Sequence, residues 1–131
     1  MLVIPIESHV GPQVRGMIQL LESRNMSPGL INDLPVFGLI AYDNGEPVAA
    51  GFLRDIEGPY AMLDSYITNP NAPAKVRNRA LNLITDKLIK VARLNDKVKL
   101  LAFTADLHTH WRSLEHGFTY LPHTFSAITL K

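Results

Sequence analysis

The stretch ITNPNAPAKVRNRALNLITDKLIKVAR spans residues 67–93 and determines the fold that the sequence predicts. Its apolar residues recur at helical spacing and predict an amphipathic helix over residues 76–93. No acidic residue occurs between residues 69 and 85. Three cations instead lie around the predicted start of the helix: Lys75, Arg77 and Arg79. Since a helix N-terminus carries a partial positive charge and normally attracts Asp or Glu, this pattern suggests a bound anion.

The exposed amides of a helix N-terminus, with the helix dipole behind them, form a binding site for anions. The cations would then complete a phosphate site between the end of a strand and the start of the helix. The alternative is that these side chains are solvated and merely unfavourable, by about 0.3–1 kcal/mol each. Charge alone leaves both interpretations open.

The segments around this helix predict strands, turns and two further helices. Asn44-Gly45 suits a tight hairpin because both residues accept positive φ. In chain order we expect a strand at 2–6, a helix within 11–23, two strands within 36–55, a strand at 59–68, the helix at 76–93, a strand at 98–104, a short helix within 105–118 and a closing hairpin or bent strand at 119–131. A helix that joins strand 59–68 to strand 98–104 makes a crossover, so these two strands should run parallel.

The expected fold class is therefore α/β (α+β). We predict a mixed, mainly antiparallel sheet with a parallel central pair, flanked by helices, in one domain over residues 1–131.

The predicted short helix has Asp106 as a plausible N-cap and Gly117 just after its end. Its apolar residues repeat at 4-3-4 spacing and should face the core: Leu107, Trp111, Leu114 and Phe118. His108 and His110 are two residues apart and point in nearly opposite directions on a helix, so no metal site is expected.

Composition excludes several classes of protein and site. Hydrophobic residues make up 47% and charged residues 19%, as in a globular protein rather than a disordered one. A net charge of +1 weighs against a broad nucleic-acid footprint. The absence of cysteine removes disulfides, thiolate metal sites and a cysteine nucleophile, and fits a reducing cytoplasm. Neither a signal peptide nor a membrane span of about 20 apolar residues is predicted.

The order of the predicted elements resembles the GNAT superfamily of acyl-CoA-dependent N-acetyltransferases. Three antiparallel strands within 36–68 end in ITNP, and a helix with arginines at its start follows. After one more strand comes a short helix that ends in GF. The resemblance covers nearly the whole chain, most convincingly residues 35–118. The motifs ITNP…R..AL and HGF are similar to those of short GNAT-like proteins of bacteriophages and bacteria. This resemblance implies a cytoplasmic protein, in the host cytoplasm if a phage encodes it.

In that family a loop of the form Arg/Gln-x-x-Gly-x-Gly/Ala wraps the pyrophosphate of coenzyme A with its backbone amides. The stretch RNRALN here has Arg77 at the first position, Ala80 where the first glycine belongs and Asn82 at the second. Glycine lets a backbone approach phosphate closely, so its absence leaves two alternatives. The flanking cations compensate for a weaker loop, or the loop has stopped binding phosphate.

The resemblance also implies that the strands before and after the cationic helix splay apart and bind the pantetheine arm, here at residues 66–68 and 102–104. It assigns the following residues to acetyl-CoA, the expected cosubstrate: Tyr66, Ile67, Thr68, Lys75, Val76, Arg77, Asn78, Arg79, Ala80, Thr104 and Asp106.

The last helix of the family begins with an Asn near the pantetheine and carries a Tyr that protonates the departing thiolate. Counted back from Gly117, Asp106 takes the Asn position and Ser113 the Tyr position. A serine hydroxyl is far less acidic than a phenol, so His110, one turn earlier, is an alternative acid, unless it is simply a surface residue. Tyr66 and Tyr120 are further donors.

The base that takes the proton of the amine is expected to be Asp64, in strand 59–68. Asp55, Glu57 or a chain of waters could replace it, and Asp64 could equally be a hydrogen-bonded structural group.

The leading hypothesis is direct transfer of an acetyl group from acetyl-CoA to an unidentified small-molecule or peptide amine. The alternative is a catalytically inactive GNAT-fold binding module that acts through a protein partner, which the missing glycines and tyrosine favour. A third hypothesis, contact of the three cations with a nucleic-acid backbone, is disfavoured by the near-neutral charge. Dimerisation is compatible with the resemblance.

Overall fold

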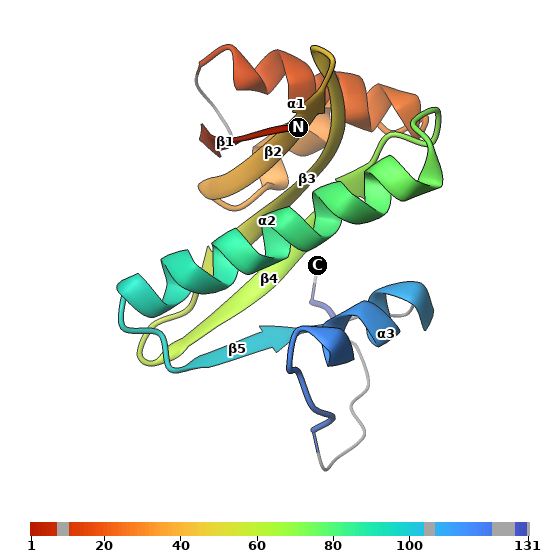
Figure 1. Ribbon diagram of the computed structural model, residues 1–131. Helices are drawn as coiled ribbons and strands as arrows, with labels where there is room; N and C mark the ends of the chain where they lie inside the picture. Colours follow the sequence, from red (N-terminus) through yellow and green to blue (C-terminus); the bar gives the residue numbers. More distant parts are fainter. Residues whose placement is uncertain (8–10, 104–106, 122–127, 131) are drawn as a thin grey trace.

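A computed structural model describes residues 1–7, 11–103, 107–121 and 128–130 (Figure 1). Five strands form one sheet in the order β1-β2-β3-β4-β5. The strands are β1 (Leu2–Glu7), β2 (Phe37–Asp43), β3 (Glu46–Asp55), β4 (Tyr60–Thr68) and β5 (Lys99–Ala102). Neighbours from β1 to β4 are antiparallel, and β4 and β5 are parallel, which confirms the mixed sheet. The parallel pair includes the last strand of the described sheet.

Four helical segments accompany the sheet: α1 (Gln13–Ser23), the 3-10 helix η1 (Pro28–Asp33), α2 (Ala74–Leu94) and α3 (Leu107–Glu115). The predicted hairpin at Asn44-Gly45 is confirmed, with φ of 50° and 81° at the two turn residues. No helix among the described residues is both long enough and apolar enough to cross a membrane.

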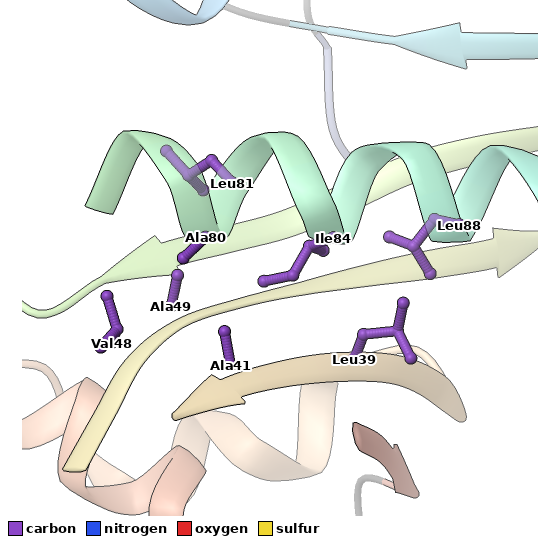
Figure 2. Packing of buried hydrophobic residues seen from close by; sticks show 8 residues of the cluster. All are labelled: Leu39, Ala41, Val48, Ala49, Ala80, Leu81, Ile84 and Leu88. Carbon is purple, nitrogen blue, oxygen red and sulfur yellow. The ribbon is translucent and has the colours of Figure 1, made fainter. Parts of the chain in front are cut away.

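Helix α2 covers one face of the sheet with small and branched apolar side chains (Figure 2). Ala80, Ile84 and Leu88 are fully buried and point toward β2 and β3, where Leu39 and Ala49 belong to the same cluster. Their spacing of four residues keeps them on one stripe, which is why the periodicity predicted this helix correctly.

Helix α1 covers the opposite face. Met17, Leu20 and Leu21 pack there with Ile40 and Phe52 of the sheet. The sheet is thus buried on both faces over β2 and β3, and β4 pairs with β3 along one edge.

The start of α2 lies at Ala74, two residues before the predicted position. Pro73 occupies the N-cap and offers no side-chain cap. The preceding turn is fixed by Asn69, whose Oδ1 accepts a bond from the amide of Asn71 at 2.9 Å and whose Nδ2 donates to Pro47 O at 3.3 Å. The segment RNRALN lies inside the helix, as the predicted helix over 76–93 requires, whereas the family resemblance assigned it to a phosphate-binding loop.

The face of α3 is where the sequence prediction was wrong. Trp111 is 57% exposed and Leu114 is 42% exposed, although their spacing predicted a core-facing stripe. The helix instead turns polar residues inward: Arg112 and His116 bond to side chains of α2. Residues 119–121 and 128–130 form no strand, and the rest of the predicted closing hairpin or bent strand lies outside the described residues.

Candidate functional site

The parallel strands β4 and β5 part in the middle of β4. Their pairing runs from Tyr60 opposite Lys99 to Leu63 opposite Ala102, while β4 continues to Thr68 beside β3. Ser65 lies at the point of divergence with a φ of 55°, a left-handed conformation that is uncommon outside glycine. This divergence is the opening that the family resemblance implied.

A bulge in β4 accompanies the divergence. Ala50 of β3 pairs with Ile67 and Phe52 pairs with Asp64, so Gly51 alone faces the two intervening residues. A bulge re-aims side chains and bends its strand, which explains why β4 leaves β5 at this point. A Cβ on Gly51 would lie only 2.6 Å from the Tyr66 ring, so the ring can occupy this position only because residue 51 has no side chain.

Tyr66 extends from the bulge toward α2. Its hydroxyl lies 2.9 Å from Thr85 Oγ1, and either oxygen can be the donor. Burial raises the pKa of Tyr66 to about 12, although the bond to Thr85 and the charge of Arg112 oppose that shift. The phenol therefore keeps its proton at neutral pH.

A cavity of about 200 Å³ fills the space between the parted strands, and we call it the gap cavity. Residues from β4, β5, α2 and α3 line it, among them Asp64, Ser65, Tyr66, Thr85, Arg112 and Ser113.

A second, larger hollow of about 530 Å³ adjoins the far end of β4 and the first turn of α2, and we call it the cationic groove. Three arginines from separate parts of the chain line it: Arg24, Arg77 and Arg112. No Asp or Glu is among its lining residues in the part of the chain that the structure describes. Tyr66 and Arg112 line the gap cavity and the groove alike, so the two hollows adjoin.

Each arginine is held by a bond to a neighbouring element. Arg24, after α1, donates through Nε to Thr68 O at 2.8 Å and through Nη2 to Thr68 Oγ1 at 2.6 Å. Arg77 Nη1 lies 3.5 Å from Pro70 O, and Arg112 Nη2 donates to Asn78 Oδ1 at 2.7 Å. Arg112 Nε is buried without a partner among the described residues. A buried guanidinium donor without an acceptor suits a site that receives an anion.

The residues assigned to acetyl-CoA by resemblance fall into distinct places. Those that line the cationic groove are Tyr66, Ile67, Thr68, Arg77 and Asn78. Lys75 and Arg79 are exposed on α2 and do not line it. Val76 packs against the apolar cluster beneath α2 and Ala80 belongs to that cluster. Thr104 and Asp106 lie outside the described residues.

The candidate catalytic residues are likewise separated. Asp64 lines the gap cavity, accepts from Arg54 Nε at 2.5 Å and accepts from Ser65 Oγ at 3.2 Å. Ser113 also lines it, but its hydroxyl donates to Thr109 O at 2.9 Å.

His110 does not line the gap cavity. Its ring lies against Tyr120, with Nε2 bonded to the phenolic oxygen and the ring centroids 4.6 Å apart. Both alternatives to Asp64 lie near the preceding turn, where Asp55 pairs with Lys97 at 2.7 Å and Glu57 is exposed. No cluster of three or more His, Asp or Glu suited to a metal ion occurs among the described residues.

A polar seam between α2 and α3 was missed from the sequence. His116 Nδ1 lies 2.9 Å from Asp86 Oδ1, and its Nε2 lies 3.2 Å from Asn82 Oδ1. Asn78, Asn82 and Asp86 recur every four residues on α2, and Arg112 of α3 and His116, just after its end, are also four residues apart. Matching polar stripes at helical spacing were the available signal.

Solved structures of acetyltransferases share this fold. The ribosomal-protein-alanine N-acetyltransferase from Brucella melitensis biovar Abortus 2308 has 15% identity and a TM-score of 0.71, with 98% of each chain covered. The aminoglycoside 6'-N-acetyltransferase from Acinetobacter haemolyticus has 16% identity and a TM-score of 0.67, with 100% of both chains covered. A predicted acetyltransferase from Clostridium acetobutylicum, solved with acetyl-CoA, has 12% identity and a TM-score of 0.70, covering 97% of this chain and 95% of that one.

The chain matches no protein-family model and no curated protein sequence. Its structural neighbours over the full length are GNAT acetyltransferases, which confirms the fold that the resemblance implied. At these identities the likeness concerns the fold, and the activity has to be argued from the site.

Proposed function

We propose that this protein is an acyl-CoA-dependent N-acetyltransferase that moves an acetyl group from acetyl-CoA directly to an amine. One observation carries the proposal. A groove lined by three arginines and free of lining carboxylates, in the described chain, adjoins the gap cavity between β4 and β5 and shares Tyr66 and Arg112 with it. Such a pair of hollows suits a ligand with an anionic head and a long, thin, uncharged arm.

The anionic head would be the phosphates of coenzyme A. Arginine binds phosphate through two parallel hydrogen bonds. The Nε of Arg112, which has no partner in the part of the chain that the structure describes, is a donor for one of them. The amides of Val76 and Arg77 already donate to Pro73 O at 3.0 Å. The two preceding amides, of Ala74 and Lys75, have no acceptor within the described chain and lie at the N-terminal end of α2, where anions are stabilised.

The uncharged arm would lie along the part of β4 that β5 no longer pairs with, around residues 66–68. The exposed edge of a strand offers backbone donors and acceptors to an extended ligand, and pantetheine carries two amides that can use them. The thioester would then reach the gap cavity beside Tyr66.

In the proposed reaction the amine nitrogen attacks the thioester carbonyl, a C–N bond forms and the C–S bond breaks. The proton lost by nitrogen is balanced by the proton that the departing thiolate gains. Tyr66 is the proton donor that this geometry favours, because its phenol is protonated and lines both hollows. Asp64 is the carboxylate that lines the gap cavity and remains the proposed base, while Ser113 is a second candidate donor.

Thermal unfolding with and without coenzyme A tests the proposal. A ligand at one hundred times its dissociation constant adds about 2.7 kcal/mol to the free energy of unfolding. Arg77→Glu should abolish this stabilisation, because the charge reverses inside the groove. Arg79→Glu is the matched control, since it makes the same charge change on an exposed position of α2 that does not line the groove.

Stabilisation of the wild type and of Arg79→Glu, but not of Arg77→Glu, would support the cofactor site. Release of free thiol from acetyl-CoA in the presence of amines then measures transfer. No stabilisation at millimolar coenzyme A would overturn the enzyme hypothesis in favour of a GNAT-fold module that binds a protein partner.

A further inference from the structure

A third hollow lies on the α1 face of β4, and we call it the apolar pocket. Its volume is about 240 Å³. The side chains of α1 and of the segment after it form most of the wall, together with three residues of β4. The lining residues are Met17, Leu21, Met26, Leu30, Asp33, Leu34, Ser65, Tyr66 and Ile67.

The apolar pocket and the gap cavity share the bulge of β4. Ser65 and Tyr66 line both hollows, and Tyr66 also lines the cationic groove. Met17, Leu21 and Ile67 belong to the cluster on the α1 face, whereas Tyr66 packs into the cluster on the α2 face. The pocket therefore approaches the divergence of the strands from the side opposite α2, and a molecule in it would point one end at the bulge.

The wall of the apolar pocket is mainly apolar and carries one charged group among the described lining residues. Six lining side chains are apolar, and Asp33 of η1 is the single charged group among the described lining residues. A lone carboxylate in a mainly apolar wall attracts an ammonium group. The other polar lining side chains are Ser65 and Tyr66, and two hydroxyls are too few partners for a ligand with many hydroxyl or amino groups. The volume lies below the roughly 300–1,000 Å³ of pockets that hold drug-sized ligands.

We propose that this pocket holds the acceptor and that the acceptor is a small primary amine with an apolar aliphatic or aromatic body. This inference rests on the proposed acetyl transfer. The ammonium form would be drawn in by Asp33 and would lose one proton to solvent before the nitrogen attacks the thioester at the bulge. The C–N bond forms and the C–S bond breaks. The products are an N-acetyl amide and coenzyme A, whose sulfur carries a proton that balances the second proton, which leaves nitrogen as the amide forms.

Methionine methyl NMR locates binding without any need for turnover. The chain has four methionines, of which Met17 and Met26 line the pocket, Met62 lines the gap cavity and Met1 lies at a different hollow formed by β1 and the β2–β3 turn. Phenethylamine and isoamylamine should shift the signals of Met17 and Met26 and leave that of Met1 unchanged. Spermidine and an aminoglycoside should leave all of them unchanged.

Variants sharpen the assignment. Asp33→Asn should weaken phenethylamine binding about two- to fivefold, the range expected for one partly exposed ion pair. Glu22→Gln is the matched control, because it removes one negative charge from an exposed position of α1 that does not line the pocket. Leu34→Arg should abolish binding of the amine while the stabilisation by coenzyme A persists.

The outcomes separate the two proposals. Transfer that prefers spermidine, an aminoglycoside or a lysine peptide by about tenfold or more, or absence of shifts at Met17 and Met26, would overturn the assignment of the acceptor while coenzyme A binding still stood. Loss of coenzyme A stabilisation in the wild type would instead overturn the proposed function. A preference for the apolar amines that falls in Asp33→Asn and not in Glu22→Gln would support the inference.

Discussion

Helices α2 and α3 have similar sequence patterns and opposite relations to the sheet. Both show apolar residues at helical spacing. Helix α2 buries its apolar stripe, with Ala80, Ile84 and Leu88 at 0% exposure, whereas α3 leaves Trp111 57% exposed. The spacing of apolar residues therefore identifies a helix but does not determine which of its faces packs against the sheet. The difference follows from the surroundings: α2 lies over paired strands of the sheet, whereas α3 lies beyond the end of β5, beside the place where β4 and β5 part (Figure 1).

The largest expected effect tests whether the two regions really differ in packing. Phe52→Ala removes a fully buried ring from the α1 face and should lower the free energy of unfolding by about 3–5 kcal/mol. Trp111→Ala removes a larger ring from the exposed face of α3 and should change it by less than about 0.5 kcal/mol. Urea unfolding of both variants makes the comparison, and a comparable loss in Trp111→Ala would show that its face is covered in solution.

The stability of the protein at alkaline pH tests Tyr66, which packs against the cluster under α2 and also lines the gap cavity near α3. Because the pKa of Tyr66 is raised to about 12 by burial, the folded protein holds the phenolic proton more tightly than the unfolded chain. The resulting stability is present in full below pH 10 and is lost as the pH rises from 10 towards 12. The loss approaches about 2–3 kcal/mol at the upper end.

Urea unfolding at about pH 8 and about pH 11 measures that loss. Tyr66→Phe is the control, since it keeps the ring over Gly51 and removes the titrating group. Burial also raises the pKa of Tyr42, so both proteins should share a part of the alkaline destabilisation. If the wild type and Tyr66→Phe lose equal stability, the phenol is hydrated in solution and the gap cavity is more open than the structure shows.

The sequence predicted the parts of the fold that local patterns control. Residue spacing and connectivity predicted the hairpin at Asn44-Gly45, the helix that the structure shows as α2, and the parallel crossover, and each is present. The start of α2 was misplaced because the turn before it depends on Asn69 and its bonds to Asn71 and Pro47. No such long-range bond is visible in a hydrophobic pattern.

The candidate site was predicted only where it lies close to the cationic helix. Arg77 lines the groove, but Arg24 and Arg112 come from segments 53 positions before and 35 positions after it in the chain. Their charges look like ordinary surface cations until the fold brings them together. Lys75 and Arg79 illustrate the converse, because proximity in sequence to a helix start placed them in the prediction and the helical turn points them elsewhere.

The smallest expected effect concerns how α3 is attached. Its polar contacts to α2 include Arg112 with Asn78, and His116 with Asn82 and Asp86. His116→Ala should lower the free energy of unfolding by about 1 kcal/mol, because it removes the polar contacts to Asn82 and Asp86. Since Arg112 lines both the groove and the gap cavity, loosening α3 should nevertheless weaken stabilisation by coenzyme A severalfold.

A double-mutant cycle between His116→Ala and Asp86→Ala distinguishes loss of the contact between α3 and α2 from a general loss of stability. Exposed Glu115→Ala is the control on the same helix. A coupling of about 0.5–1 kcal/mol, together with weaker coenzyme A binding in both single variants, would show that the polar seam holds α3 over the gap. Additive effects with unchanged binding would mean that α3 keeps its position by other contacts. The exposed stripe of Trp111 and Leu114 would then be the place to look for them, because those are the remaining apolar side chains that α3 offers among the described residues.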